Sequence, residues 1–480
     1  MGSCKVDGMF SRAEGYVEEI PYTYGYHPEI TPANMSLALA LAGVEAPVVR
    51  TACEFGFGQG VSLAINSVAG DALWFGNDLL PEHVAQARAL VAGTDAKIVL
   101  TDETFAEFCV RDDLPLFDYV ALHGVWSWVS ARNRDTIVRF LRERLAPGGV
   151  VYVGWNTLAG WRSMLPLRDR MLEDIHRRRA AGATLESAIA AARAAVEAQH
   201  DPDAEVAVRF LRRQSIPYLA HELFNRDWQP MEFGDLACAF ASAGLEFVAE
   251  ARPVDAFDRL NFTAPQRATL CGLEVIAREE AKDRFLARKF RRDYFRKTTA
   301  ARSSAADPAT QRIMSTRASI AVDEIVVGAS AIRVDPALVR HVVTGLCDEP
   351  RTIGSLFTAK YGRDAVLECV AALIRTECVA PVGASRARDA DCQILNTRLL
   401  DLSRRHAEVS VLASPVTGAG IDVGRVTMQF VDLWRQGVRD VDALAVHGCF
   451  DGEDREAVRV RAESFVRSEL PHLRRLLGSE

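Results

Sequence analysis

The sequence predicts an α/β fold, in which a Rossmann-like sheet is interrupted by a helical insertion and followed by a mainly helical C-terminal region. Between residues 48 and 158, short apolar segments alternate with amphipathic ones. Such alternation is typical of a parallel sheet with right-handed crossovers. A glycine-rich turn directly follows the first apolar segment, at the edge where such sheets bind ligands. Two more strands after the insertion bring the expected sheet to seven strands.

The first five strands and their connecting helices have the clearest pattern. We expect strands at residues 48–54, 73–78, 97–101, 117–122 and 150–155, and helices near 60–69, 81–92, 103–109 and 132–145. Residues 1–46 should form an arm and a cap helix. The Tyr-, Pro- and Gly-rich stretch 16–32 disfavours a helix, whereas Thr31 and Pro32 favour the start of one. The ligand-binding core should therefore span residues 47–160.

The remaining segments complete the sheet and add further domains. Residues 161–230 have helical periodicity and form the insertion. Residues 231–300 complete the sheet, with a helix at 232–243, a strand at 245–251, a helical stretch at 264–286 and a strand at 288–296. A linker at 298–312 leads to a winged-helix-like domain at 313–395, with helices at 336–347, 352–360 and 364–377 and a strand at 378–382. The C-terminal helical region, 396–480, has helices at 396–406, 427–437 and 453–477 and a Gly-rich loop at 414–424.

The composition argues against several classes of protein. Hydrophobic residues make up 49% and charged residues 25% of the 480 residues, so the chain can fold around a packed core. The net charge of −7 argues against a nucleic-acid coat protein. The first twenty residues are charged, which argues against a signal peptide, and the lack of a long uncharged run argues against a membrane span. The ten cysteines are scattered without a C-x-x-C pair, which favours reduced thiols in the cytoplasm over disulfides or a metal site.

Residues 53–60 (CEFGFGQG) form the most informative motif, because they end the first strand and begin a helix. Gly56, Gly58 and Gly60 permit a tight turn and a close approach of a ligand to the backbone. Their G-x-G-x-G spacing differs from the G-x-G-x-x-G of dinucleotide sites, since Val61 occupies the position of the third glycine. A turn with a purely structural role is the alternative.

Acidic residues stand at the ends of three successive strands. Glu54 lies two positions before Gly56, and Asp102 ends the third strand. Asp78 stands 22 positions after Gly56, close to the spacing of about 20 residues at which a carboxylate binds ribose hydroxyls. Each acid taken singly could instead cap a helix, but the three together favour a ligand site.

This order of motifs, with the loop 123–128 (HGVWSW) after the fourth strand and the turn 145–149 (LAPGG) before the fifth, resembles class I methyltransferases that use S-adenosylmethionine (SAM). In that family the first acid holds the methionine ammonium, and the acid after the third strand accepts from adenine. The loop after the fourth strand faces the transferred methyl group. The resemblance implies SAM as cofactor, S-adenosylhomocysteine as product and these cofactor-binding residues: Glu54, Gly56, Phe57, Gly58, Gly60, Asp78, Leu79, Asp102, Glu103, Thr104 and His123.

Four stretches resemble a narrower bacterial group, the SAM-dependent methyltransferases with a methyltransferase regulatory domain. They are residues 22–26 (YTYGY), 123–128 (HGVWSW), 156–161 (NTLAGW) and 218–228 (YLAHELFNRDW), and the resemblance extends from about residue 16 to 300. Ala159 departs from the group, where a proline is common. Members of the group resemble protein-lysine methyltransferases of bacterial surface or outer-membrane proteins, which implies that substrate class here. A small-molecule methyltransferase and a non-catalytic SAM-binding regulatory protein are the alternatives.

A lysine acceptor must lose its proton before methylation, which at pH 7 costs roughly 4–5 kcal/mol for a pKa near 10.4. A desolvating aromatic channel and a polar side chain can meet this cost. The expected catalytic residues are Tyr22, Tyr26, His123, Trp126 and Asn156, and Tyr24, Trp128 and Trp161 are further candidates for the channel wall. His123 has three alternative roles, as a base, as a cofactor contact or in polar packing, and Asn156 could equally stabilise a turn. His221 and Asn225 share a helix face, either over the cleft or in the core.

Two further stretches bear on binding partners. Residues 282–302 carry an excess of basic residues, which would suit an acidic protein partner or a solvated face. Residues 336–382 have too few basic residues for a nucleic-acid interface dominated by phosphate contacts. We therefore expect a protein substrate and no nucleic acid, and a homodimer is compatible with the sequence. We hypothesise that the part of the chain after residue 305 recruits the substrate.

Overall fold

The computed structural model describes residues 20, 22–198, 205–299, 305–318, 334–383, 388–450 and 454–478. Five of the expected segments fall partly outside these described residues. The parts outside are 1–19 and 21 of the arm, 199–204 of the insertion, 300–304 of the linker, 319–333 and 384–387 of the winged-helix-like domain, and 451–453 and 479–480 of the C-terminal region.

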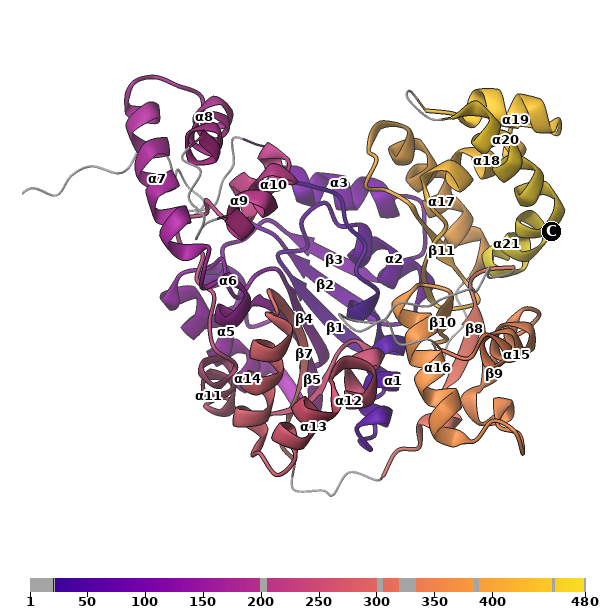
Figure 1. Ribbon diagram of the computed structural model, residues 1–480, viewed down its shortest axis with the longest axis horizontal. Coiled ribbons are helices and arrows are strands. Elements are labelled where there is room, and N and C mark those ends of the chain that lie inside the picture. Colours follow the sequence, from indigo (N-terminus) through magenta and orange to yellow (C-terminus); the bar gives the residue numbers. More distant parts are fainter. Residues whose placement is uncertain are drawn as a thin grey trace, which may run out of the picture.

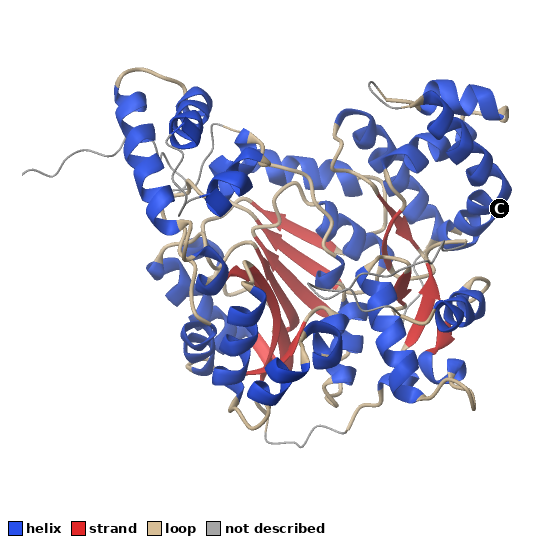
Figure 2. Cartoon of the chain, viewed as in Figure 1, coloured by secondary structure: helices blue, strands red, loops and turns tan. Residues whose placement is uncertain are grey.

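A seven-stranded sheet forms the centre of the first 300 residues, in the order β3-β2-β1-β4-β5-β7-β6 (Figures 1 and 2). Its strands are β1 (Thr51–Phe55), β2 (Leu73–Asn77), β3 (Ile98–Thr101), β4 (Phe117–His123), β5 (Leu145–Asn156), β6 (Leu245–Glu250) and β7 (Phe290–Lys297). The first five strands are parallel, whereas β7 is antiparallel to both β5 and β6. The predicted Rossmann-like sheet of seven strands is confirmed, and it is mixed rather than wholly parallel.

Helices cover both faces of this sheet. The helices α1 (Pro32–Leu41), α2 (Val61–Ala69) and α3 (Pro81–Val91) pack on one face. The helices α4 (Phe105–Phe108), α5 (Ala131–Arg144) and α11 (Phe233–Ala241) pack on the other. The first four crossovers therefore follow the sequence pattern closely, because each helical segment has an apolar side that packs on the sheet.

The predicted helical insertion is present, and its described residues form five helices with a hydrophobic core of their own. They are α6 (Leu158–Trp161), α7 (Leu165–Ala180), α8 (Leu185–Ala198), α9 (Glu205–Arg212) and α10 (Ile216–Glu222). After α11 and β6, the chain forms α12 (Asp258–Asn261), α13 (Ala264–Leu270) and α14 (Val275–Leu286). The helical stretch expected at 264–286 is thus divided, with Gly272 in the left-handed region (φ 82°) between α13 and α14.

The next unit has a three-stranded sheet of β8 (Arg312–Ser315), β9 (Arg351–Thr352) and β10 (Val379–Pro381) in the order β10-β8-β9. The helices α15 (Pro336–Leu346) and α16 (Arg363–Arg375) agree with the expected ones. The helix expected at 352–360 is wrong, since only a 3-10 turn at Ile353–Leu356 forms there. Gly354 and Gly362 lower the helical propensity of this segment. The winged-helix assignment therefore stays a prediction.

The last unit contains α17 (Asp389–Arg405), a hairpin of β11 (Val411–Ser414) and β12 (Ala419–Asp422), α18 (Arg425–Arg435), α19 (Val441–Gly448), α20 (Arg455–Ser464) and α21 (Leu470–Leu477). The Gly-rich loop expected at 414–424 is therefore largely a hairpin. The sequence pattern also missed α19. The helix expected at 453–477 begins at residue 455 and is interrupted by a π-helical turn at Phe465–Glu469.

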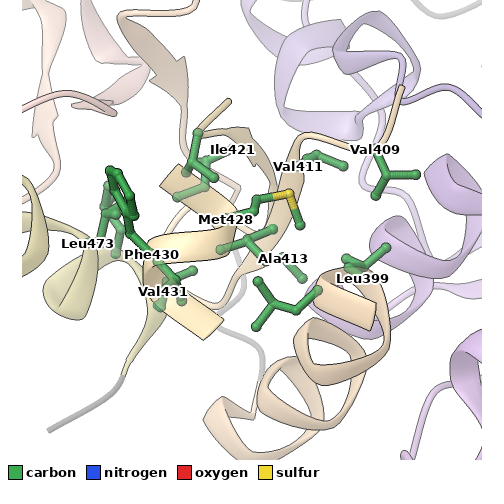
Figure 3. Packing of buried hydrophobic residues seen from close by; sticks show 14 of the residues in the cluster. Leu399, Val409, Val411, Ala413, Ile421, Met428, Phe430, Val431 and Leu473 are labelled. Carbon is green, nitrogen blue, oxygen red and sulfur yellow. The ribbon is translucent and has the colours of Figure 1, made fainter. Parts of the chain in front are cut away.

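The helix α2 joins the last unit to the sheet. All nine of its residues are buried. Leu63 belongs to the core between α2 and the sheet. Val61, Ile65 and Val68 belong instead to the core of the last unit. Leu399, Val411 and Ile421 of this core are labelled in Figure 3. The last unit therefore completes the burial of α2 and shares a hydrophobic core with it.

A buried ion cluster connects β7 to α14. The Arg291 side chain is fully buried and bonds to Asp293, Asp283 and Glu279. The Trp155 indole N–H donates to Asp293 as well (2.8 Å). The basic stretch at 282–302 is thus not an open docking surface, because several of its cations, including Lys282, lie in buried ion pairs.

We predict that Arg291→Ala lowers the free energy of unfolding by about 3–5 kcal/mol, because it leaves buried carboxylates without their cation. Chemical denaturation at pH 7 measures the loss. The matched control is Arg405→Ala, which removes an exposed arginine paired with Asp401 and should cost less than about 0.5 kcal/mol. Equal losses in the two variants would contradict a structural role for the cluster.

Candidate functional site

A cavity opens at the carboxyl ends of β1, β2 and β4, where the sequence motifs meet. Its lining comes from the arm, the glycine turn, the loops after β2, β3 and β4, and the helices α3, α4, α5 and α10. The lining residues are Tyr22, Gly56, Gly58, Asp78, Leu79, Leu80, His83, Glu103, Thr104, Phe105, His123, Gly124, Val125, Trp128, Val129, Asn133, His221 and Glu222. The structure thus brings together residues that are 200 positions apart.

The glycine turn adopts backbone conformations that favour glycine. Gly56, Gly58 and Gly60 have φ values of 60°, 58° and 74°. A Cβ atom on Gly60 would lie 2.7 Å from the Cβ of Ala87 on α3. Gly56 and Gly58 line the cavity, whereas Gly60 and the buried Phe57 lie outside its lining and pack against α3 and the core. The turn therefore combines a packing role with an open backbone at the cavity.

Asp78 links the glycine turn to the start of α3. One carboxylate oxygen accepts the N–H of Gly58 (2.8 Å), and the other accepts the N–H of Leu80 (3.0 Å) and lies 3.0 Å from Nδ1 of His83. The bond to Leu80 matches the capping role considered for this acid. The oxygen that accepts from Gly58 has a second lone pair, so Asp78 can hold the turn and still accept from a ligand.

Glu54 lies buried next to this site, at the end of β1, with 3% of its surface exposed. Its Oε2 atom has no hydrogen-bond partner within the described part of the chain. Burial raises the pKa of Glu54 to about 8, and the nearby Asp78 contributes to the rise. A buried carboxyl without a partner is costly, and a cationic ligand group would relieve that cost.

The loop after β3 presents Glu103 rather than Asp102 to the cavity. Asp102 is exposed and lies outside the lining, whereas Glu103 and Thr104 are part of it. The buried Asn77 orients this loop, since its side chain accepts from the Glu103 N–H (3.2 Å) and donates to the Glu103 carbonyl (3.0 Å). Asn77 was not predicted as a site residue, because a single polar residue inside an expected strand forms no recognisable motif.

The tyrosines of the arm point to different places. Tyr22 enters the cavity and lies edge-on to His221, with 5.1 Å between ring centroids. Tyr24 packs on His406 (4.3 Å), and the Tyr26 hydroxyl accepts the N–H of Gly420 (2.8 Å). Tyr26 was expected in the catalytic channel, but it lines a second cavity between the arm, the sheet and the last two units. Residues two positions apart would share one face of a regular strand, so the different directions of these rings follow from the irregular backbone of residues 22–27, which form neither helix nor strand.

His123 ends β4 and lines the cavity. Its Nδ1 atom lies 2.7 Å from the Tyr152 hydroxyl, and its ring stacks on His27 at 3.6 Å. Burial, followed by His27, holds the pKa of His123 well below its ordinary value, and burial also lowers the pKa of His27 to about 4. Both rings are therefore neutral at pH 7, and His123 is a weak proton acceptor.

Several expected site residues lie in the core instead of the cavity. Trp126 is buried against Phe240 at 5.1 Å. Trp161 is buried among the insertion helices. Asn156 is also buried and outside the lining. Trp126 and Asn156 were expected to be catalytic, and the cavity geometry does not support this. In contrast, Trp128 lines the cavity.

The two polar residues after α9 also separate. His221 lines the cavity, and its Nε2 atom lies 2.8 Å from the carbonyl of Ile20. Asn225 follows the end of α10 and is buried, with its side-chain oxygen accepting the N–H of Asp227 (3.0 Å). The expected common helix face is wrong, because α10 ends at Glu222.

The charge of the cavity lining has one sign. Asp78, Glu103 and Glu222 are its acids, and no Lys or Arg is among the described residues that line it. Glu222 was missed, although it lies inside the motif at 218–228. Acidic and aromatic surfaces together favour a cationic ligand. Among the described residues, no group of three or more His, Cys, Asp or Glu side chains is arranged for a metal ion, and no helix is long and apolar enough to cross a membrane.

Comparisons with known proteins agree with this architecture. A family model described as "Predicted methyltransferase regulatory domain" matches residues 216–297, which extend from α10 to β7. An uncharacterized protein of Synechocystis is 34% identical over 296 residues, covering 59% of this chain and 58% of its own length. An uncharacterized protein of Rickettsia prowazekii is 30% identical over 164 residues, covering 32% and 28% respectively. The chain thus spans less than two thirds of either relative.

Solved structures extend the similarity to almost the whole chain. PKMT2 from Rickettsia typhi aligns with a TM-score of 0.63 and 14% identity, covering 95% of this chain and 99% of that one. Its complex with AdoHcy aligns with a TM-score of 0.67 at the same identity and coverage. At this level of identity the similarity shows the fold. The chain therefore has the Rossmann-like class I methyltransferase fold, and residues 216–297 match the methyltransferase regulatory domain.

We predict that Glu54→Gln makes the free energy of unfolding less dependent on pH. A folded-state pKa of about 8, against an ordinary 4.5, means that the folded state binds the proton more tightly than the unfolded chain. Wild-type stability should therefore fall as the pH rises from 5 to 8, by an amount on the order of 3 kcal/mol. Denaturation of the ligand-free protein at both pH values measures the difference between wild type and variant.

The control for this prediction is Glu246→Gln, an exposed position on β6. It should leave the difference between pH 5 and pH 8 as in the wild type. The prediction fails if Glu54→Gln behaves like this control.

Proposed function

We propose that the protein is a SAM-dependent methyltransferase that N-methylates lysine side chains of a bacterial surface or outer-membrane protein. The observation that carries this proposal is the cavity at the glycine turn, which is acidic and aromatic and has no Lys or Arg in its described lining. SAM carries a sulfonium and an ammonium, and a lysine acceptor carries another ammonium. Both ligands therefore suit a cavity of this charge.

The residues around the cavity fit the parts of SAM. Gly56 and Gly58 leave the backbone open to the methionine moiety, and Glu54 can accept from its ammonium group. Asp78 would accept from the ribose hydroxyls. Glu103, together with its neighbours Leu79, Thr104 and Phe105, would surround the adenine. When bound, SAM supplies a methyl group that is activated by its attachment to a positively charged sulfur, and S-adenosylhomocysteine leaves as the product.

The lysine acceptor is supported by the fold and by the chemistry of the cavity. PKMT2, a protein lysine methyltransferase, has the same fold over 95% of this chain. Tyr22 and Trp128 provide aromatic surface in the cavity, which stabilises cations and methylated ammonium groups. Methyl transfer to a bound amine is an in-line displacement, for which positioning of the two reactants supplies most of the rate enhancement.

Recruitment of the substrate by the part after residue 305 stays a proposal. Truncation there would not test it, because α2 would lose the hydrophobic cover that the last unit gives it. The consequence would be a destabilised glycine turn, and a loss of SAM affinity unrelated to recruitment. Substitutions on exposed surfaces of the last two units are the appropriate test.

We predict that the purified protein transfers a labelled methyl group from SAM to lysine in a bacterial outer-membrane protein fraction. Acid hydrolysis and amino-acid analysis identify the methylated residue. Asp78→Asn should lower SAM affinity by about 30- to 100-fold, because it removes a charged acceptor that both holds the turn and faces the ligand. Asp71→Asn, in the exposed turn before β2, is the matched control and should leave affinity and transfer within about twofold.

The outcomes separate the parts of the proposal. Label in methylated lysine, lost in Asp78→Asn, supports the whole of it. Label only in small molecules or in other amino acids would contradict the lysine acceptor. No transfer together with no binding of SAM in calorimetry would contradict a methyltransferase.

A further inference from the structure

Glu222 is the last residue of α10 and belongs to the region that matches the methyltransferase regulatory domain. It lines the cavity together with the glycine turn and His123. The Trp128 indole N–H donates to the backbone carbonyl of Glu222 (3.2 Å), which fixes the end of the helix. Because Trp128 also lines the cavity, this bond determines where the Glu222 backbone lies relative to the loop after β4.

The surroundings of Glu222 contain no cation that would neutralise it. Tyr22 from the arm and Tyr218 from α10 lie close to Glu222. Burial raises the pKa of both tyrosines, and the charge of Glu222 raises it further. His221 lies against Tyr22, and Asp78 and His83 lie beyond that ring. Among the described residues, no Lys or Arg forms an ion pair with Glu222. Burial raises the pKa of Glu222 to about 7.

The other acids of the cavity already have partners. Asp78 accepts two backbone N–H groups. Glu103 is paired with Arg111 at 3.4 Å. His123, the other candidate for proton transfer, contacts Tyr152 and His27, and its lowered pKa makes it a poor acceptor. Within the described lining, Glu222 is the acid whose carboxylate has neither an ionic nor a hydrogen-bonded partner.

We propose that Glu222 is the group that binds the ammonium of the acceptor and takes its proton before methyl transfer. This inference rests on the proposed function, since it requires SAM in the same cavity. The acceptor R–NH₃⁺ gives one proton to the Glu222 carboxylate and becomes R–NH₂. The amine lone pair then forms a bond to the methyl carbon while the carbon–sulfur bond breaks and leaves its electrons on sulfur. The products are R–NH₂⁺–CH₃, neutral S-adenosylhomocysteine and protonated Glu222, which returns its proton to water.

The chemistry of the cavity favours this transfer. An ammonium with an ordinary pKa near 10.4 is a much weaker acid than a carboxyl group in water. Removal from water lowers the pKa of an amine and raises that of a carboxyl, and Glu222 shows the second effect already. The two values therefore approach one another inside the cavity, which is the condition for efficient general-base catalysis.

The test uses sinefungin, a SAM analogue with an amine in place of the transferable methyl group, and needs no knowledge of the acceptor. Calorimetry gives the ratio of the dissociation constants of S-adenosylhomocysteine and sinefungin. In the wild type at pH 8, where Glu222 is ionised, sinefungin should bind at least about tenfold more tightly. Glu222→Gln should abolish this preference and leave the affinity for S-adenosylhomocysteine within about threefold.

The pH dependence provides a second measurement on the wild type itself, which holds even if the variant folds poorly. The preference for sinefungin should weaken from pH 8 to pH 6, because protonation of Glu222 removes the charge that binds the amine. Glu103→Gln is the matched control, since Glu103 lines the same cavity but is paired with Arg111. It should weaken both ligands equally and leave their ratio unchanged.

Two results would overturn the inference. If both ligands bind and their ratio is the same in wild type and Glu222→Gln at pH 8, Glu222 does not meet the acceptor amine, and the proposed function stands without it. If neither ligand binds to the wild type, the proposed function fails, and this inference fails with it.

Discussion

The burial of α2 is the constraint on which the rest of the structure depends. This helix begins at the glycine turn and has no exposed residue. The sheet covers one side of it through Leu63, and the last unit covers the other through Ile65 and Val68. A helix held on all sides keeps its first turn in a fixed position, because interiors are close-packed and resist small displacements. The backbone of Gly56 and Gly58 is thereby fixed relative to Asp78, which bonds to that turn.

The N-terminal arm makes a second connection between the last unit and the cavity. Tyr24 and Tyr26 of the arm contact His406 and Gly420 of the last unit, whereas Tyr22 enters the cavity. The same arm thus contributes to the site and to the contact between the sheet and the last unit. A change in that contact would shift the position of Tyr22 in the cavity, since Tyr22 is only two residues from Tyr24.

The sequence predicted the elements with a strong repeating pattern, and it failed where contacts distant in sequence decide. Alternating strands and helices located β1 to β5 and the loops at their ends, so Asp78 and the glycine turn were found correctly at the cavity edge. Trp126 and Trp128 are two positions apart and equally aromatic, but one packs on Phe240 in the core and the other lines the cavity. Nothing local to either residue distinguishes them. The basic stretch around Arg291 looked exposed because its carboxylate partners on α14 were not visible as partners in the sequence.

The site also departs from what stability alone would favour. Glu54 is buried with an oxygen that has no partner within the described residues, and Glu222 faces the cavity without a cation. Such groups lower the stability of the ligand-free protein. Under the proposed function a cationic ligand would neutralise both groups, in agreement with the general finding that local rules are broken at functional sites.

The most direct test of this account is a crystal structure of the protein with S-adenosylhomocysteine. The account predicts one molecule in the cavity at the glycine turn, with its ribose hydroxyls on Asp78 and its adenine beside Leu79 and Glu103. Binding in the second cavity next to Tyr26, or a ribose that does not contact Asp78, would contradict it.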